Sequence, residues 1–202
     1  MFSQQVTRLS DSIVVLNLAK IQGGRNAVIA RVPDSPGVYA WFRNLTHAGS
    51  DISSSDRFAD ALIDLIESKH CLDRRGRIKP MYEVVLRSKK SLSETKKDAL
   101  REYSRQSDFR DQLMEILQYA LLFQQPLYVG KASDLAVRVN DHLAPSSSLR
   151  NRLSQAGIEI DTCWLMYVTL RDESTEGLPS RELVIEDLLS RLFHPLFVHR
   201  YG

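Results

Sequence analysis

The stretch that decides the fold covers residues 126–143 and has the sequence PLYVGKASDLAVRVNDHL. Its first five residues are mostly apolar and rich in β-formers, which predicts a buried strand. Ser133 or Asp134 can then act as the N-cap of a helix that runs to about Leu143. A strand followed at once by a helix is typical of a layered α/β protein, and such a strand needs others to pair with.

Those other strands and helices are predicted from periodicity and turn residues. The N-terminal residues 13–18 and 27–32 are expected to form a β-hairpin around Gly23 and Gly24. We place a turn at Arg75-Gly76-Arg77, because a glycine between charged residues is typical of a turn. The remaining expected strands cover residues 38–42, 81–86 and 158–170, and the remaining helices cover residues 56–68, a segment from Ser93, 109–123, 148–155 and 180–194.

The composition is that of a soluble protein of one domain. Of the 202 residues, 43% are hydrophobic and 26% are charged, which is enough to bury a core. The apolar runs are too short and too interrupted for a membrane span, and no secretory signal is visible at the start. The two cysteines, Cys71 and Cys163, match no metal-ligand spacing. We favour two thiols in a reducing cytoplasm over a disulfide.

Positive charge is concentrated in one segment. The net charge of the whole chain is only +2, yet residues 69–90 contain eight basic residues and two acidic ones. Such a segment can bind phosphates even when the global charge is small, and the alternative is a solvated surface. The residues proposed to bind nucleic acid are Arg74, Arg75, Arg77, Lys79, Lys89 and Lys90.

Four separated pieces of sequence carry side chains that could take part in catalysis or bind a metal ion. Two are strand motifs, Gly37-Val38-Tyr39 and Tyr128-Val129-Gly130-Lys131. The third is the pair Arg138 and His142, which lie at i and i+4 and therefore project from one face of a helix. The fourth is Glu186, in an apolar stretch of the last helix. A carboxylate in such a place needs a partner, and a cation is the natural one.

Together these pieces resemble the GIY-YIG nuclease superfamily, which includes the N-terminal domain of the excision-repair endonuclease UvrC and some homing and restriction endonucleases. Arg138 follows Gly130 by eight residues, and Glu186 precedes Pro195 by nine, as in the family pattern. The resemblance implies an α/β (α+β) fold with a small central, mainly antiparallel sheet flanked by helices. The core would consist of residues 33–43 and 126–198, with an N-terminal extension at 1–32 and a large, mostly helical insertion at 44–125.

The resemblance also implies a role for each site residue. Glu186 would hold one Mg²⁺ or Mn²⁺, with waters and a phosphate oxygen completing the coordination. Arg138 would bind the scissile phosphate, and Lys131 would add positive potential beside it. Either Tyr39 or Tyr128 would be the base that activates water, and the choice stays open. His142 would hydrogen-bond to a tyrosine or accept a proton.

The chain departs from the family pattern at two points. Val198 stands where many members have an asparagine, and the two tyrosine motifs are separated by the long insertion. We expect a metal-dependent endonuclease that cuts DNA rather than RNA. Two alternatives are a binding module that has lost cleavage and a nuclease subunit of a larger complex, with a protein partner bound through the helical insertion.

Overall fold

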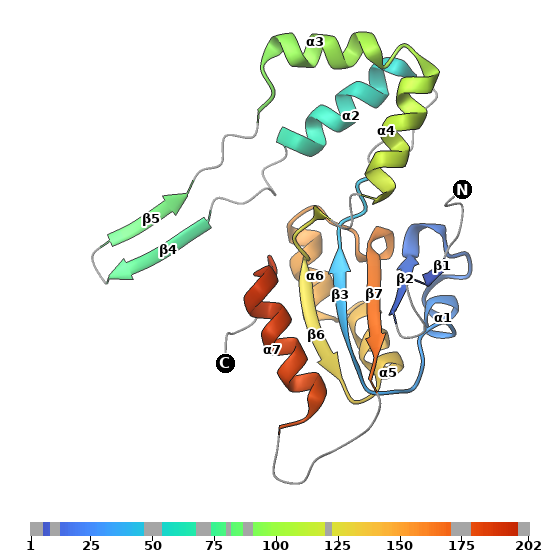
Figure 1. Cartoon of the computed structure of the whole chain (residues 1–202), viewed down its shortest axis with the longest axis vertical. Helices are drawn as coiled ribbons and strands as arrows, with labels where there is room; N and C mark the ends of the chain where they lie inside the picture. Colours follow the sequence, from blue (N-terminus) through green and yellow to red (C-terminus); the bar gives the residue numbers. More distant parts are fainter. Residues whose placement is uncertain are drawn as a thin grey trace. The chain divides into compact units, whose positions relative to one another are not determined.

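The computed structural model describes residues 6–8, 13–46, 54–67, 74–79, 82–86, 91–119, 123–170 and 179–197 (Figure 1). The chain divides into two compact units, one made of residues 1–44 and 120–202 and the other of residues 45–119. These bounds lie close to the core and the insertion expected from the sequence. The candidate active-site residues belong to the first unit and the basic segment to the second.

The first unit is built on a five-stranded sheet in which every neighbouring pair is antiparallel. The spatial order is β1-β2-β7-β3-β6, so β6 lies at one edge. The strands are β1 (Val6–Arg8), β2 (Ile13–Asn17), β3 (Gly37–Phe42), β6 (Tyr128–Ala132) and β7 (Trp164–Thr169). The expected fold class, an α+β protein with an antiparallel sheet flanked by helices, is confirmed.

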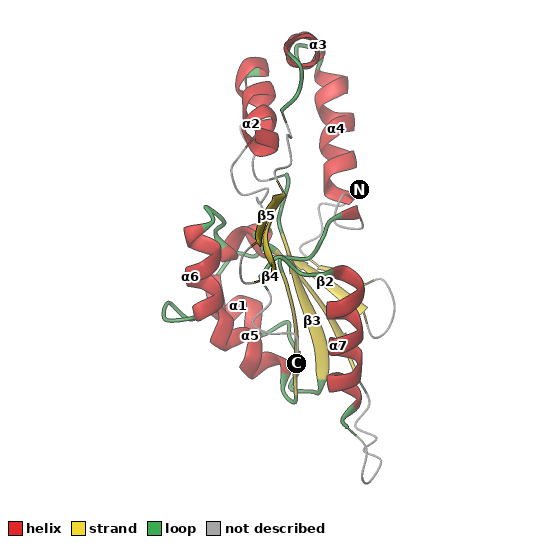
Figure 2. Cartoon of the chain, turned by 90° about the vertical axis from the view of Figure 1, so that its left-hand side faces the viewer, coloured by secondary structure: helices red, strands yellow, loops and turns green. Residues whose placement is uncertain are grey.

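Helices cover both faces of this sheet (Figure 2). One face carries α1 (Gly24–Ile29), α5 (Leu135–Leu143) and α6 (Ser148–Gln155), and the other carries α7 (Arg181–Phe193). Two short 3-10 helices, η1 (Leu18–Lys20) and η3 (Ile160–Thr162), precede α1 and β7.

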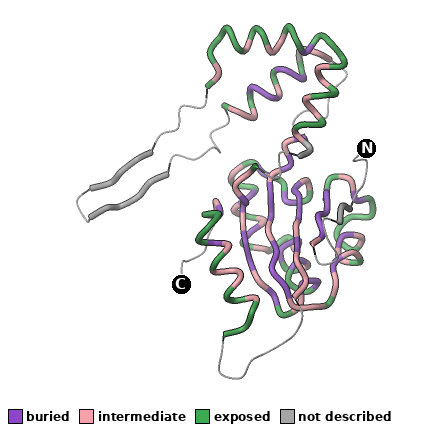
Figure 3. The backbone as a smooth tube through the Cα atoms, viewed as in Figure 1, coloured by how far each residue is buried: buried purple, intermediate pink, exposed green. Residues whose placement is uncertain are grey.

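Buried residues are concentrated along the strands, as Figure 3 shows. Because side chains alternate along a strand, Tyr39 and Trp41 share one face of β3, and both belong to the larger core cluster with α5 and α6. The opposite face has a smaller cluster of Val15, Phe42 and Trp164. Burying one large apolar side chain stabilises the fold by roughly 2 kcal/mol, so most of the stability of this unit comes from the α5 and α6 side.

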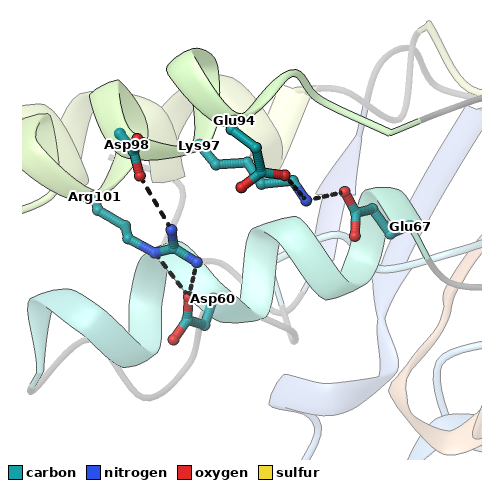
Figure 4. Close-up of polar contacts among 6 residues, drawn as sticks. All are labelled: Asp60, Glu67, Glu94, Lys97, Asp98 and Arg101. Atoms are coloured by element: carbon teal, nitrogen blue, oxygen red, sulfur yellow. Dashed lines mark hydrogen bonds and ion pairs between the residues drawn. The ribbon is translucent and has the colours of Figure 1, made fainter.

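The second unit consists of α2 (Ser55–Glu67), the hairpin of β4 (Arg74–Lys79) and β5 (Tyr82–Leu86), α3 (Glu94–Tyr103) and α4 (Ser107–Tyr119). Helix α2 buries Phe58 and Leu62, whereas α3 has no buried residue. Ion pairs join these two helices, as Figure 4 shows. Lys97 contacts Glu67 at 2.8 Å, and Arg101 contacts Asp60 at 3.2 Å. Solvent-accessible pairs of this kind, partly buried for Lys97 and exposed for Arg101, contribute at most about 1 kcal/mol each, so they set the register of α3 more than its stability.

Most of the expected elements are present, but the prediction of a β-hairpin from residues 13–18 and 27–32 was wrong. Residues 27–32 contain part of helix α1, and the strands that pair with β2 are β1 and β7. Gly23 and Gly24 adopt positive φ angles of 98° and 64°, which turn the chain into the helix. The Ala30 amide donates to the carbonyl of Asn26 at 3.0 Å and the Val32 amide to that of Ile29 at 2.9 Å, so these amides are not available for strand pairing.

Two further predictions need correction. Arg75-Gly76-Arg77 is not a turn, because Gly76 pairs with Val84 inside the β4–β5 hairpin. The strand expected at residues 158–170 begins only at Trp164. Before it, the Thr162 hydroxyl donates to the carbonyl of Glu159 at 2.8 Å, and this local bond favours the 3-10 turn of η3 over an extended chain.

The first prediction concerns the cap of helix α5. The Asp134 carboxylate accepts a hydrogen bond from the Val137 amide at 2.9 Å, whereas Ser180, the N-cap of α7, makes no such side-chain bond. We expect Asp134→Ala to lower the free energy of unfolding by about 1 kcal/mol and Ser180→Ala to change it little, as measured by urea denaturation. Both helices belong to the first unit, so equal losses in the two variants would contradict the assigned cap.

Candidate active site

Tyr39 is held at the centre of the candidate site by the pairing of β3 with β6. It lies in the middle of β3 and is only 2% exposed. Its register partner is Gly130. A Cβ atom added at Gly130 would lie 2.5 Å from the Tyr39 hydroxyl oxygen and 2.8 Å from Cε1 of Tyr128. The glycine of the second strand motif is therefore required because the two tyrosine rings occupy the space beside it.

Helix α5 brings two more side chains to Tyr39. Leu135 and Val139 anchor its apolar face in the core, and this sets the rotation of the helix. The same rotation buries His142, whose Nε2 lies 2.6 Å from the Tyr39 hydroxyl oxygen. One turn earlier, the exposed Arg138 donates from Nε to the same oxygen at 3.3 Å. Arg138 and His142, the predicted i, i+4 pair, thus both contact Tyr39, although their helix lies about one hundred residues further along the chain.

Aromatic rings complete the group around His142. Tyr128 lies against both Tyr39 and His142, with ring centroids 6.1 and 5.4 Å apart. Trp41 presents its edge to the His142 ring at a centroid distance of 6.4 Å and an interplanar angle of 86°. Tyr39, Tyr128, Arg138 and His142 therefore form one contiguous cluster, which we call the tyrosine–histidine cluster.

Burial determines the charge state of this cluster. Burial raises the pKa of Tyr39 well above its usual range and Tyr128 adds to the rise, while Arg138 opposes it. Burial, together with the positive charges of Arg138 and Arg152, lowers the pKa of His142 to about 4. At neutral pH the two partners are a neutral phenol and a neutral imidazole. We therefore place the shared proton on Tyr39, which donates to His142 while its oxygen accepts from Arg138.

The structure places the other two predicted site residues on the opposite side of the sheet. Lys131 pairs with Val38, so by strand alternation it belongs to the face away from Tyr39. Glu186 lies on α7, which packs on β6 and β3 from that face (Figure 2). Its carboxylate accepts a hydrogen bond from the Ser190 hydroxyl at 3.4 Å. The six predicted residues thus form two groups, and both groups border the edge strand β6.

The donor atoms limit which metal this site could hold. Within the described ranges no group of three or more His, Cys, Asp and Glu side chains converges on one point. A closed zinc site would need such a group. A single carboxylate completed by waters and a phosphate oxygen suits Mg²⁺ or Mn²⁺, and Glu186 is the residue that would supply it.

The predicted nucleic-acid-binding residues belong to the second unit. Arg74, Arg75, Arg77 and Lys79 lie on β4. Lys89 and Lys90 lie outside the described residues, as do Cys71 and Val198. Cys163 carries a free, buried thiol, and burial raises its pKa to about 12, so it is an inert core residue. None of the described helices combines the length and the apolar character needed to cross a membrane.

Sequence reasoning missed Trp41. It is fully buried next to His142, and its indole N–H has no hydrogen-bond partner among the described residues. A tryptophan in an alternating strand resembles any other core residue, so only the contact with His142 indicates that it supports the site. No protein-family model, curated protein or solved structure matches this chain in comparisons with known proteins.

Protonation of His142 should make the fold sensitive to acid. The unfolded chain binds a proton at His142 below about pH 6.5, whereas the folded chain does so only near pH 4. Stability is therefore intact above pH 6.5 and falls by roughly 3 kcal/mol as the pH drops to about 4. We expect urea denaturation between pH 7.5 and 4 to show this slope in the native chain and in His194→Gln. His142→Gln should lack it, and an unchanged slope in that variant would refute the assignment.

The fit between Gly130 and Tyr39 gives another prediction. Gly130→Ala should destabilise the native chain by about 1–3 kcal/mol, because the new methyl group overlaps the Tyr39 ring. In a Tyr39→Ala background the same change should cost clearly less, because two of the three closest atoms are gone. Denaturation of the native chain and the three variants measures this coupling, and equal costs in the two backgrounds would mean that the ring is not the obstacle.

Proposed function

We propose that this chain is a divalent-metal-dependent endonuclease of the GIY-YIG type that hydrolyses phosphodiester bonds in nucleic acid, with DNA as the preferred substrate. The observation that carries the proposal is the convergence of Tyr39, Tyr128, Arg138 and His142 on one point. The resemblance to the GIY-YIG superfamily implied a shared site for these four residues. A buried Tyr–His hydrogen bond beside an exposed guanidinium is an arrangement suited to moving a proton next to a phosphate.

In this proposal Arg138 binds the scissile phosphate. Its guanidinium is exposed and touches the Tyr39 oxygen, so an anion bound to it lies next to the tyrosine hydroxyl. Paired N–H donors on a guanidinium suit phosphate oxygens and offset the charge that develops during attack. Tyr128, which is half-buried in the same cluster, borders the phosphate.

Tyr39 and His142 would act as a proton relay. As a water oxygen attacks phosphorus, the water proton passes to the Tyr39 oxygen and the hydroxyl proton of Tyr39 passes to Nε2 of His142. The bond from phosphorus to the leaving oxygen then breaks. Of the two tyrosines, we assign the relay to Tyr39 because it has a proton acceptor 2.6 Å away. This removes the need for an ionised tyrosine, whose formation burial opposes.

Glu186 would hold the metal, and Lys131 would add positive potential, from the α7 side of the sheet. Because β6 is the edge strand, we place the scissile phosphate at this edge, where both faces of the sheet are adjacent. A bound Mg²⁺ or Mn²⁺ would supply Lewis-acid chemistry, which makes a coordinated water more acidic and neutralises phosphoryl oxygens. The family resemblance and the oxygen-donor character of Glu186 support this assignment.

A second candidate function, a nuclease subunit of a larger assembly, is favoured by one observation. Helix α7 leaves Val184, Leu188 and Leu192 more than half exposed, at a spacing that puts them on one stripe. Three large apolar residues in a row on the surface are typical of a docking face. For this second candidate function we propose α7 of the core as the docking face, in place of the helical insertion that the sequence suggested.

A cleavage assay tests the proposed function. Labelled single- and double-stranded DNA and RNA are incubated with the native chain in Mg²⁺, Mn²⁺ or EDTA. We expect metal-dependent cutting that falls by about 10²–10³-fold in Arg138→Ala, because one charged donor to the transition state is lost. Glu186→Ala should also lose cutting, whereas Glu182→Ala, one turn earlier on α7, should not. Cutting in EDTA, or equal effects of the two glutamate variants, would refute the metal assignment.

A further inference from the structure

The His142 ring is enclosed by aromatic side chains from two strands. The ring centroids of Tyr128 and Tyr39 lie 5.4 and 5.5 Å from that of His142, and the centroid of Trp41 lies 6.4 Å away. Trp41 and Tyr128 are register partners of β3 and β6, so the pairing of these strands places both rings beside the imidazole. The two tyrosines carry hydroxyl groups, and Trp41 adds the largest apolar surface of the set.

The torsional preferences of histidine do not fix the orientation of this imidazole. Rotation about the χ2 bond is broad, so neighbouring groups have to select one orientation. The Tyr39 hydroxyl fixes the position of Nε2 through a contact of 2.6 Å, but one hydrogen bond constrains the tilt of the ring plane only weakly. The ring planes of Tyr128 and Trp41 stand at 67° and 86° to that of the imidazole and limit this tilt. Trp41 is fully buried and close-packed, so it is a fixed wall.

The indole N–H of Trp41 indicates that apolar packing is not the whole reason for a tryptophan at this position. This buried N–H has no hydrogen-bond partner among the described residues. Burying an unsatisfied donor destabilises the fold, and phenylalanine at the same position would carry no such cost. Contact with His142 is a role that gains from the greater length of the indole ring.

We propose that Trp41 is a positioning residue of the candidate site, which holds the His142 imidazole with Nε2 toward the Tyr39 hydroxyl and keeps water away from the ring. It touches neither phosphate nor metal in the proposed mechanism, so it acts through His142. The proton relay requires the 2.6 Å contact of Nε2 with the Tyr39 oxygen, and misplaced reacting groups lower a rate steeply. The catalytic purpose of this role rests on the proposed function, whereas the contact of Trp41 with His142 does not.

The groups around His142 determine what the exclusion of water does. Tyr39 of β3 and Tyr128 of β6 lie against the ring, and Arg138 of α5 and Arg152 of α6 act on it as positive charges. Burial is the largest cause of its low pKa, and the two arginines add to it. A shorter side chain in place of the indole admits water and removes part of the burial effect, while the arginines stay. The pKa of His142 should therefore rise without reaching its ordinary value.

The first test measures the protonation of His142 by NMR on the full chain without substrate. The imidazole signal is identified by its absence in His142→Gln. Between about pH 7.5 and 5 the native signal should stay that of a neutral ring, because the pKa of His142 is about 4. In Trp41→Phe the midpoint should rise by about one unit or more, to about pH 5 or above.

The matched control is Trp164→Phe. Trp164 is the other tryptophan of the chain and is also buried, but it belongs to the smaller core cluster on the opposite face of the sheet. This variant loses the same atoms from a core and should leave the His142 signal as in the native chain. An unchanged midpoint in Trp41→Phe, or an equal rise in both variants, would overturn the proposal.

A shape-preserving replacement separates the volume of the indole from its N–H group. In the Trp164→Phe chain Trp41 is the only tryptophan, so benzothienylalanine supplied in place of tryptophan enters at position 41 alone. A sulfur atom then replaces the unpartnered N–H, and the fold should be retained even where Trp41→Phe does not fold. We expect His142 to stay neutral down to about pH 5. A raised midpoint would mean that the shape of the bicyclic ring does not protect the imidazole, and the proposal would fail.

The cleavage assay connects this role to catalysis. Because a higher pKa protonates His142 earlier on acidification, Trp41→Phe should lose cutting at a higher pH than the native chain, and Trp164→Phe should not. If the His142 midpoint moves as expected but the native chain cuts nothing, the proposed function fails while the role of Trp41 stands. If DNA is cut and neither the midpoint nor the pH profile responds to Trp41→Phe, only the positioning role fails.

Discussion

The antiparallel pairing of β3 with β6 is the constraint on which the candidate site depends. It joins two strands that are separated in the sequence by the whole second unit, and it sets Tyr39 opposite Gly130. A shift of one residue would turn Tyr39 to the other face of the sheet and put a side chain where its ring now lies. The contacts of Tyr39 with His142 and Arg138 exist only in this register. The tyrosine of the first strand motif therefore fits only because the residue opposite it in the second motif is a glycine, which has no side chain.

A second consequence of this geometry is electrostatic. In the free protein His142 has a low pKa, because it is buried and two arginines are near, and so it is a poor proton acceptor. In the proposed mechanism, a phosphodiester bound at Arg138 would bring negative charge close to His142 and offset that guanidinium, which would raise the pKa of the imidazole. The proposed proton relay would then become competent only when substrate is present. In its absence the Tyr39–His142 pair stays neutral, which is the state that a buried pair with little solvation can tolerate.

Much of the core could be predicted from the sequence because its signals are local. The cap at Asp134, the i, i+4 pair on α5 and the stop at Pro195 depend only on nearby residues. The predictions that were wrong concern segments whose conformation depends on contacts with residues far away in the sequence. Residues 27–32 have strand-forming side chains, but residues 27–29 end helix α1, and the amides of Ala30 and Val32 bond to nearby carbonyls. Gly76 was predicted to lie in a turn, because the sequence around it does not identify Val84 as its strand partner.

The same limit applies to the candidate site. The spacing of Arg138 and His142 places them on one helical face, and the structure adds that this face meets Tyr39. No spacing rule shows on which side of the sheet a helix packs, so the sequence could not reveal that α7 carries Glu186 on the face opposite to Tyr39. It also could not reveal Trp41 as the neighbour of His142, since that contact joins a strand to a distant helix.

In the proposed mechanism, the low pKa of His142 also limits how many basic residues the candidate site can hold. Each additional cation near this imidazole would lower its pKa further, as Arg138 and Arg152 already do, and would remove the proton acceptor that the relay needs. Binding a polyanion tightly needs many cations, whereas a neutral imidazole that accepts a proton needs few cations nearby. The two roles are therefore easier to combine when different residues carry them. In the proposed function Arg138 binds the phosphate at the candidate site. The residues of β4 that are proposed to bind nucleic acid, Arg74, Arg75, Arg77 and Lys79, belong instead to the second unit. Binding strength and proton transfer can then be adjusted by different residues, without one weakening the other.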